Sequence, residues 1–152
     1  MQIYLDVCCL NRPFDDQSRQ RIRLESDAVQ AILERVERGE FQLLTSGAAD
    51  SELIRVADFD RREAVRELAG RACRHIPLSS DIGRRALALE QGKLDPLDAL
   101  HLAYAESVPC DILFTVDDAF VRRAARLSPP SPVRVVNPAP WILEHEHGGE
   151  TA

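Results

Sequence analysis

Short apolar runs alternate with longer amphipathic stretches along this chain, and that alternation predicts a sheet between helices. Runs typical of buried strands occupy residues 3–5, 41–45 and 111–116, with weaker examples at 75–78 and 133–136. Apolar positions recur at helical spacing over residues 18–38, 46–57, 60–73, 80–91, 96–105 and 119–127, and a short terminal helix is predicted over 138–145. Strands that alternate with helices are joined by right-handed crossovers and form parallel sheets.

We therefore predict a single α/β domain over residues 1–145, a three-layer α/β/α sandwich with a mostly parallel central sheet of about four to five strands. Residues 146–152 are predicted to be a flexible C-terminal tail. No apolar run approaches the roughly 20 residues that span a bilayer, and no signal peptide is visible. We expect a cytoplasmic protein.

The charge balance narrows the possible partners. The net charge is −6, which argues against broad electrostatic binding of nucleic acid. Lys93 is the single lysine, so nearly all the positive charge is arginine, the better bidentate partner for phosphate. Arginines near the predicted loops are candidate phosphate contacts or solvated helix faces: Arg12, Arg84, Arg85, Arg122 and Arg123.

Two aspartates follow predicted strands. Asp6 ends the first strand and Asp117 ends the run at 111–116. In an open parallel sheet, ligands collect at the carboxyl ends of the strands. Both positions also suit a cap on the following helix, and position alone leaves the two roles open.

Two further acids lie within predicted helices. Asp98 is the third helical position after the Asp95-Pro96 start, where the helix dipole favours an acid, but the apolar helix around it indicates burial. Glu52 lies three residues before Arg55, so an exposed ion pair would explain it.

Converging carboxylates repel one another unless a cation neutralises them, and carboxylate ligands suit Mg²⁺ or Mn²⁺. Such ions activate water for attack on a phosphate, so phosphodiester hydrolysis is the natural chemistry. No GxSxG, P-loop, GxGxxG, HExxH or zinc-type cysteine spacing competes. We expect His101 to be a packing residue and discount His145 and His147 in the terminal segment. The four cysteines, Cys8, Cys9, Cys73 and Cys110, are expected to be buried reduced thiols.

Four segments from Met1 to about Pro140 resemble the PIN-domain ribonucleases, the family that includes the VapC-type toxins of toxin–antitoxin pairs. They are YLDVCCLNRPFDD, SELIRV, LDPLDALHLAYA with its Asp-Ala-x-x-x-Ala helix, and LFTVDDAF with its Thr-x-Asp-x-x-Phe pattern. Each motif is weak alone, and the four in this order and spacing are specific.

The resemblance implies that Asp6, Glu52, Asp98 and Asp117 are the catalytic, metal-holding acids. It also implies accessory roles: Thr115 offers a hydroxyl, Asp118 could act as a fifth acid, and Asp95 could lie behind the metal ligands. The family usually has Thr or Ser directly after the first aspartate. Here that residue is Val7.

The resulting hypothesis is an Mg²⁺- or Mn²⁺-dependent endoribonuclease, the toxin of a toxin–antitoxin pair, with RNA as substrate, an antitoxin as partner and a homodimer as its assembly. The alternative is a catalytically weak or inactive PIN-like module that binds RNA or a partner protein, which the Val7 departure favours. A phosphatase of the Asp-x-Asp-x-Thr type is disfavoured, because Cys8 stands at the second Asp position.

Overall fold

A five-stranded, fully parallel sheet forms the centre of the molecule. The computed structural model describes the backbone of residues 1–150 and the side chains of residues 1–146. The strands are β1 Gln2–Leu5, β2 Gln42–Ser46, β3 Arg74–Ile76, β4 Ile112–Phe114 and β5 Arg134–Val136, in the order β3-β2-β1-β4-β5. The predicted three-layer α/β/α fold with a parallel sheet is confirmed.

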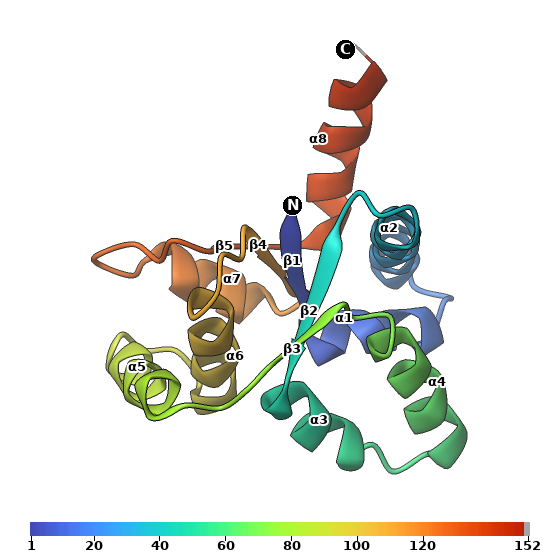
Figure 1. The fold of residues 1–152 in the computed structure, drawn as a ribbon. Helices are drawn as coiled ribbons and strands as arrows, with labels where there is room; N and C mark the ends of the chain where they lie inside the picture. The colour runs from blue at the N-terminus through green and yellow to red at the C-terminus, as the bar shows by residue number, and fades with distance from the viewer. Residues whose placement is uncertain (151–152) are drawn as a thin grey trace.

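Helices cover both faces of this sheet (Figure 1). One face carries α1 Val7–Asn11, α2 Gln20–Glu37, α4 Phe59–Ala69 and α8 Pro138–Glu150, and the other carries α5 Ser80–Gln91, α6 Pro96–Glu106 and α7 Asp118–Ala125. Helix α3 Gly47–Ile54 follows β2 at the carboxyl edge, and a 3-10 turn occupies Arg12–Phe14. None of the helices in the described part of the chain combines the length and apolar character needed to cross a bilayer.

The strands are apolar on both faces because both faces are buried. Along β1, Ile3 and Leu5 pack into the core beneath α2, while Tyr4 between them packs into the core beneath α6. This alternation follows from the two-residue period of a strand. It makes β1, in the middle of the sheet, the element that joins the two halves of the core.

The strand order places the chain's topological switch beside β1. The chain moves outward from β1 to β2 and β3, and then returns to form β4 on the other side of β1. Ligand crevices of open α/β sheets lie at such a reversal, outside the carboxyl ends of the strands. The ends of β1 and β4 therefore define where a site is expected.

A buried carboxylate ties several elements together beside that edge. Glu25 of α2 is 2% exposed and accepts hydrogen bonds from Arg12 Nε at 3.0 Å, Arg21 Nε at 3.2 Å and Asn137 Nδ2. A buried charge is tolerated when donors surround it in this way. Glu25 thus connects the 3-10 turn, α2 and the start of α8.

Some element boundaries differ from the sequence prediction. Strand β4 ends at Phe114, two residues early, because Thr115 and Val116 already belong to the turn into α7. Helix α3 ends at Ile54 rather than near residue 57. Helix α8 continues to Glu150, whereas its predicted end was His145. The flexible tail over 146–152 stays a prediction, and residues 151–152 lie outside the described part of the chain.

Trp141 offers a test of how α8 is attached. Its indole packs edge-on against Phe114 at 5.1 Å and Phe41 at 5.9 Å between ring centroids, and it is 4% exposed. We expect Trp141→Ala to lower the free energy of unfolding by about 3 to 5 kcal/mol, because it removes a large buried side chain. Leu143→Ala on the same helix is the control: Leu143 is 57% exposed, so the expected change is within about 0.5 kcal/mol. Urea unfolding measures both, and equal losses would contradict this packing.

Candidate metal centre

Asp6 lies directly after β1, at the carboxyl edge of the sheet. Its backbone N–H donates to the carbonyl of Phe114 at 3.0 Å, which continues the pairing of β1 with β4 by one residue. Its carboxylate is buried, and Oδ2 accepts hydrogen bonds from the Thr115 hydroxyl at 3.0 Å and the Cys8 thiol at 3.3 Å. Asp6 stands at the N-cap position of α1, but its side chain makes no capping bond there. The carboxylate therefore bonds to the Thr115 and Cys8 side chains and does not cap α1.

His101 joins Asp6 to Glu52. Its Nε2 hydrogen-bonds Glu52 Oε1 and lies 3.7 Å from Asp6 Oδ1. Its Nδ1 is 2.6 Å from the Tyr4 hydroxyl, which is in turn 2.6 Å from the Ser46 hydroxyl. Because both ring nitrogens have partners, the imidazole is fixed in the orientation that faces the carboxylates.

These three side chains form a possible ligand set. One oxygen of Asp6, one of Glu52 and one nitrogen of His101 all lie within 4.8 Å of one another. Carboxylate oxygens suit Mg²⁺ and Mn²⁺, and an imidazole nitrogen is acceptable to Mn²⁺. The prediction that His101 only packs is therefore incomplete. It is fully buried, but it also belongs to the acidic cluster.

Asp98 is coupled to the same cluster by charge. It lies in the first turn of α6, and burial, followed by the charges of Asp6, Asp117 and Asp95, raises its pKa to about 7. Carboxylates close enough to repel one another behave in this way. Asp98 is outside the 4.8 Å group, so it approaches the centre without joining the tightest set.

The pKa of His101 is also raised, but here burial acts against the change. Burial lowers the pKa of the imidazole, and the hydrogen bond that it donates to Glu52 and the charge of Asp6 outweigh burial. A protonated His101 is positively charged, so it offsets part of the repulsion between the carboxylates.

The acids after β4 and before α6 have separate local partners. Asp117 is the N-cap of α7, where Oδ1 accepts from the N–H groups of Ala119 and Phe120 at 2.9 and 3.2 Å. Asp95 caps α6 through the N–H of Leu97 at 3.1 Å. Asp117 and Asp95 therefore both cap the helix that follows them. In Asp117 these bonds use one oxygen and leave Oδ2 available to a ligand.

Asp118 is held away from a ligand role. Its two carboxylate oxygens pair with Arg21 at 2.7 and 2.8 Å, and this pairing lowers its pKa. Bidentate pairing with arginine uses the lone pairs that a metal would need. The geometry thus favours Asp117, and not Asp118, as the acid that follows β4. Assignment of these residues as ligands stays a prediction.

Thr115 replaces the hydroxyl that is missing after Asp6. Val7 is buried, and it packs in the core beneath α2 rather than facing the crevice. The fully buried Thr115 hydroxyl donates to Asp6 and accepts the Asp117 N–H at 3.2 Å. One hydroxyl therefore holds the carboxylate of Asp6 and the backbone of Asp117.

Glu52 does not make the ion pair that its sequence position suggested. Its carboxylate points to His101, and among the described side chains no pair with Arg55 is formed. All four cysteines are free thiols, but only Cys9 and Cys110 are buried; Cys8 is half-buried and Cys73 is exposed, so the prediction of buried thiols is wrong for these two.

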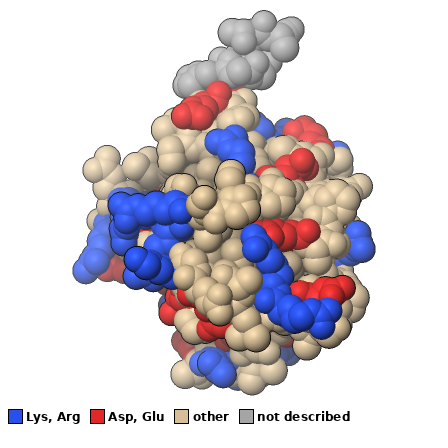
Figure 2. All heavy atoms as spheres, turned by 90° about the vertical axis from the view of Figure 1, so that its left-hand side faces the viewer, with Lys and Arg blue, Asp and Glu red and all other residues tan. Residues whose placement is uncertain are grey.

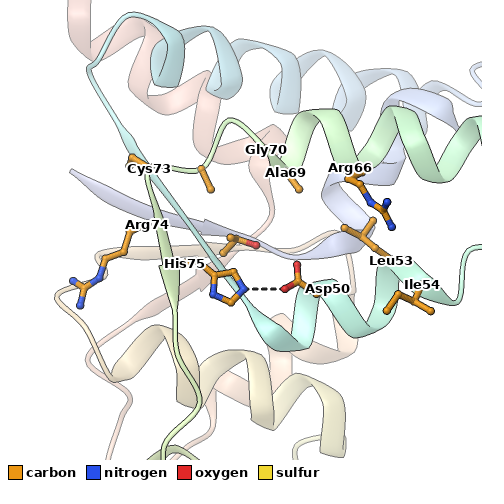
Figure 3. Close-up of a pocket in the computed structure, with 11 residues that line it drawn as sticks. Asp50, Leu53, Ile54, Arg66, Ala69, Gly70, Cys73, Arg74 and His75 are labelled. Carbon is orange, nitrogen blue, oxygen red and sulfur yellow. Dashed lines mark hydrogen bonds and ion pairs between the residues drawn. The ribbon is translucent and has the colours of Figure 1, made fainter.

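A second cavity of about 460 Å³ lies between β3, α3 and α4 (Figure 3). Its one carboxylate, Asp50, pairs with His75 at 2.8 Å, as the dashed line in Figure 3 marks. Most of its lining is apolar or basic, including Leu53, Ile54 and Arg66. A single paired carboxylate cannot neutralise a divalent cation, so the crevice beside β1 is the better candidate.

The family follows from a comparison of the sequence. Residues 3–126 match the model of the PIN domain. The chain belongs to the PIN domain family. The crystal structure of VapBC2 from Rickettsia felis bound to a DNA fragment from their promoter is similar in fold, with a TM-score of 0.58 and 16% identity over 90% of this chain and 98% of that chain. No curated protein matches the sequence.

The raised pKa of Asp98 in this PIN domain gives a pH test of the centre. The pKa is about 7 when folded and ordinarily 3.8, so the folded chain binds this proton more tightly than the unfolded chain. The contribution of protonated Asp98 to the free energy of unfolding is fully present below about pH 4 and is lost as the pH rises through about 7. We expect metal-free Asp98→Asn to gain about 1 to 3 kcal/mol over wild type between pH 5 and pH 8, after allowance for solvent screening.

Urea unfolding in EDTA at several pH values measures this gain. Asp81→Asn is the matched control, because Asp81 is also a first-turn acid but is exposed at the start of α5. Because the Asp81 side chain is exposed, this substitution should change the free energy of unfolding by no more than about 0.5 kcal/mol. A pH-independent difference for Asp98→Asn would show that the carboxylates do not interact.

Proposed function

We propose that this PIN domain is an Mg²⁺- or Mn²⁺-dependent endoribonuclease whose acids are Asp6, Glu52, Asp98 and Asp117. The observation that carries the proposal is the convergence of carboxylates at the carboxyl ends of β1 and β4. Asp6 and Glu52 share one cluster, and the charges of Asp6 and Asp117 act on Asp98. The family match supports a nuclease.

The donor set fits a divalent cation. Its members are mostly carboxylates, they repel one another, and Asp98 stays partly protonated near neutral pH without a counter-charge. Asp6, Glu52, Asp98 and Asp117 would hold the ion, and His101 Nε2 is within reach of the first two. When bound, such an ion supplies an activated water and offsets the charge on a phosphate.

The side chains of the protein set the geometry for hydrolysis. Thr115 holds Asp6, and His101 holds Glu52 through a hydrogen bond supported by Tyr4. In the reaction, the oxygen of water bonds to phosphorus and the bond to the 3′-oxygen breaks. The 3′-oxygen takes up a proton, which leaves a 3′-hydroxyl and a 5′-phosphate. Preorganised carboxylates that need no rearrangement lower the barrier to this displacement.

The alternative is an inactive PIN-like module, and its support was the missing hydroxyl at Val7. Thr115 supplies a hydroxyl to the same Asp6 carboxylate at 3.0 Å. This compensation favours the enzyme over the inactive module.

We further infer that the protein is a toxin of a toxin–antitoxin pair. The similar structure is a VapBC2 complex on promoter DNA, and the inference extends that pairing to this chain. An antitoxin partner, a homodimer and a cytoplasmic location belong to this proposal. Light scattering of the purified protein tests the dimer, and a small open reading frame immediately upstream of the gene would support the antitoxin.

Cleavage of a mixed RNA pool tests the enzyme. We expect wild type to cleave with Mn²⁺ or Mg²⁺ and to be inactive in EDTA. Asp98→Asn should lose more than about 100-fold in rate, because even residues that only support metal ligands cost 10- to 100-fold. Mn²⁺ should also raise the melting temperature of wild type but not of Asp98→Asn. The control Asp81→Asn should retain wild-type cleavage, and equal cleavage by wild type and Asp98→Asn would refute the acid site.

Thr115 gives a second test of the same centre. Thr115→Val keeps the shape of the side chain but leaves the Asp6 carboxylate and the Asp117 N–H without their hydroxyl partner. We expect a 10- to 100-fold loss of activity and a higher Mn²⁺ concentration for half-maximal rate. Thr115→Ser retains the hydroxyl and should retain most of the activity. If Thr115→Val changes only the melting temperature, the hydroxyl has no role in the metal centre.

A further inference from the structure

A basic groove of about 490 Å³ lies between the turn that joins α5 to α6 and the last turns of α7. Six residues line it: Gln91, Gly92, Lys93, Arg122, Arg123 and Arg126. Four of the six are cations, and no acid is among the described residues of the lining. This basic groove is separate from the carboxylate cluster.

The four cations are exposed and have no partner. Within residues 1–146, none of their charged groups lies within 4.0 Å of a carboxylate. Other arginines of the same side of the molecule are paired, such as Arg84 with Asp81 and Arg85 with Glu106. Figure 2 faces the side of the molecule that carries α5, α6 and α7, and a group of basic side chains lies together at its left. In a protein of net charge −6, four unpaired cations in one groove are a local exception.

The two walls of the groove are packed together at its base. A Cβ added to Gly92 would lie 2.8 Å from Leu127 Cδ2, so the α5–α6 turn and the end of α7 are already in contact there. The groove is therefore a built feature of two elements that are distant in sequence. A solvated face of one helix would need no such contact.

Lys93 is held on the rim in an unusual backbone conformation. Its φ is +74°, and its N–H donates to the Glu90 carbonyl at 2.9 Å as the α5 helix ends. Glycine or asparagine is the usual residue in this left-handed position, because a side chain there costs roughly 1 kcal/mol or more. The chain's single lysine occupies this costly position at the groove. Backbone strain carried by a charged residue indicates a gain elsewhere.

Each wall of the groove is close in sequence to acids of the candidate metal centre. Asp117 caps the N-terminus of α7, and a rise of about 1.5 Å per residue places Arg122 and Arg126 roughly 7 to 14 Å farther along that helix. On the other wall, Lys93 precedes the Asp95 cap of α6 by two residues, and Asp98 is in the first turn of the same helix. A nucleic acid strand with one phosphate at the carboxylates would therefore reach the groove within a few nucleotides.

We propose that the basic groove binds the phosphates of the RNA strand next to the one that is cleaved, an inference that rests on the proposed ribonuclease function. Arginine guanidinium groups pair with phosphate oxygens in bidentate fashion, and lysine adds a point charge. Because the protein is acidic overall and its centre repels phosphate when no cation is bound, a local cationic track supplies the attraction that the rest of the surface lacks.

The test measures RNA binding in EDTA, where no cleavage occurs, by fluorescence anisotropy of a labelled oligouridine at several salt concentrations. The variant replaces Arg122, Arg123 and Arg126 by Gln. Each lost phosphate contact lowers the slope of log K against log[salt] by about 0.7, so we expect a slope smaller by about 2 and an affinity at least 10-fold weaker at low salt. Replacing the same three residues by Lys should restore most of the slope, since the charges remain.

The control replaces Arg38, Arg66 and Arg74 by Gln, which removes the same total charge from exposed positions outside the groove, two of which are paired with Glu40 and Glu63. The slope of log K against log[salt] for this control should differ from the wild-type slope by no more than about 0.7, the change expected for one phosphate contact. Equal losses in the two triple variants, or no loss in the groove variant, would overturn the proposal. So would tighter, groove-dependent binding of duplex DNA, or groove-dependent binding of polyglutamate with RNA binding unchanged, which would indicate an acidic protein partner.

The two proposals can fail separately. If wild type binds RNA through the groove but never cleaves it with Mn²⁺, the ribonuclease is wrong and the groove stands. If wild type cleaves RNA and the groove variant binds and cleaves as well as wild type, the centre stands and the groove is wrong.

Discussion

The structure around β1 depends on holding several carboxylates close to one another at the carboxyl edge of the sheet. Asp6 is buried there, Glu52 lies beside it, and burial and neighbouring charges raise the pKa of Asp98 to about 7. Such a cluster lowers the stability of the metal-free fold, and stability of this kind is commonly given up at functional sites. The Thr115 hydroxyl and the His101 imidazole are the protein's own means of holding these acids in place.

The sheet topology supplies the framework for that arrangement. Because β1 is central and β4 returns to its side, residues more than a hundred positions apart end at the same edge. The Glu25 network then fixes the turn after α1 and the start of α8 beside it. Farther along α7 from the Asp117 cap, the basic groove gathers positive charge, so acids and unpaired cations lie on the same helix.

Much of the fold was predictable from the sequence. Strands that alternate with helices predict a parallel sheet, and in a parallel sheet the carboxyl ends of the strands lie at the same edge. Asp6 and Asp117 could be placed at one edge from the apolar runs that precede them, and Thr115 came from the family resemblance. The hydrogen-bond and ion-pair partners of individual side chains could not be predicted. His101 was taken as a packing residue because its helix is apolar on nearly every side, and its bonds to Tyr4 and Glu52 join positions 97 and 49 residues away. Arg21 and Asp118 pair across a similar separation, which no local spacing indicates.

The His101 contacts also bear on how this sequence can vary. Glu52 lies on α3, whose N-terminus is capped by Ser46, and the same Ser46 hydroxyl contacts Tyr4, which contacts His101. Hydrogen bonds thus run in a ring from β2 through β1 and α6 and back to α3. A substitution at one member strands a buried donor or acceptor at the next. Over evolutionary time, positions 4, 46, 52 and 101 can therefore drift only as a group, although they are scattered over two thirds of the chain.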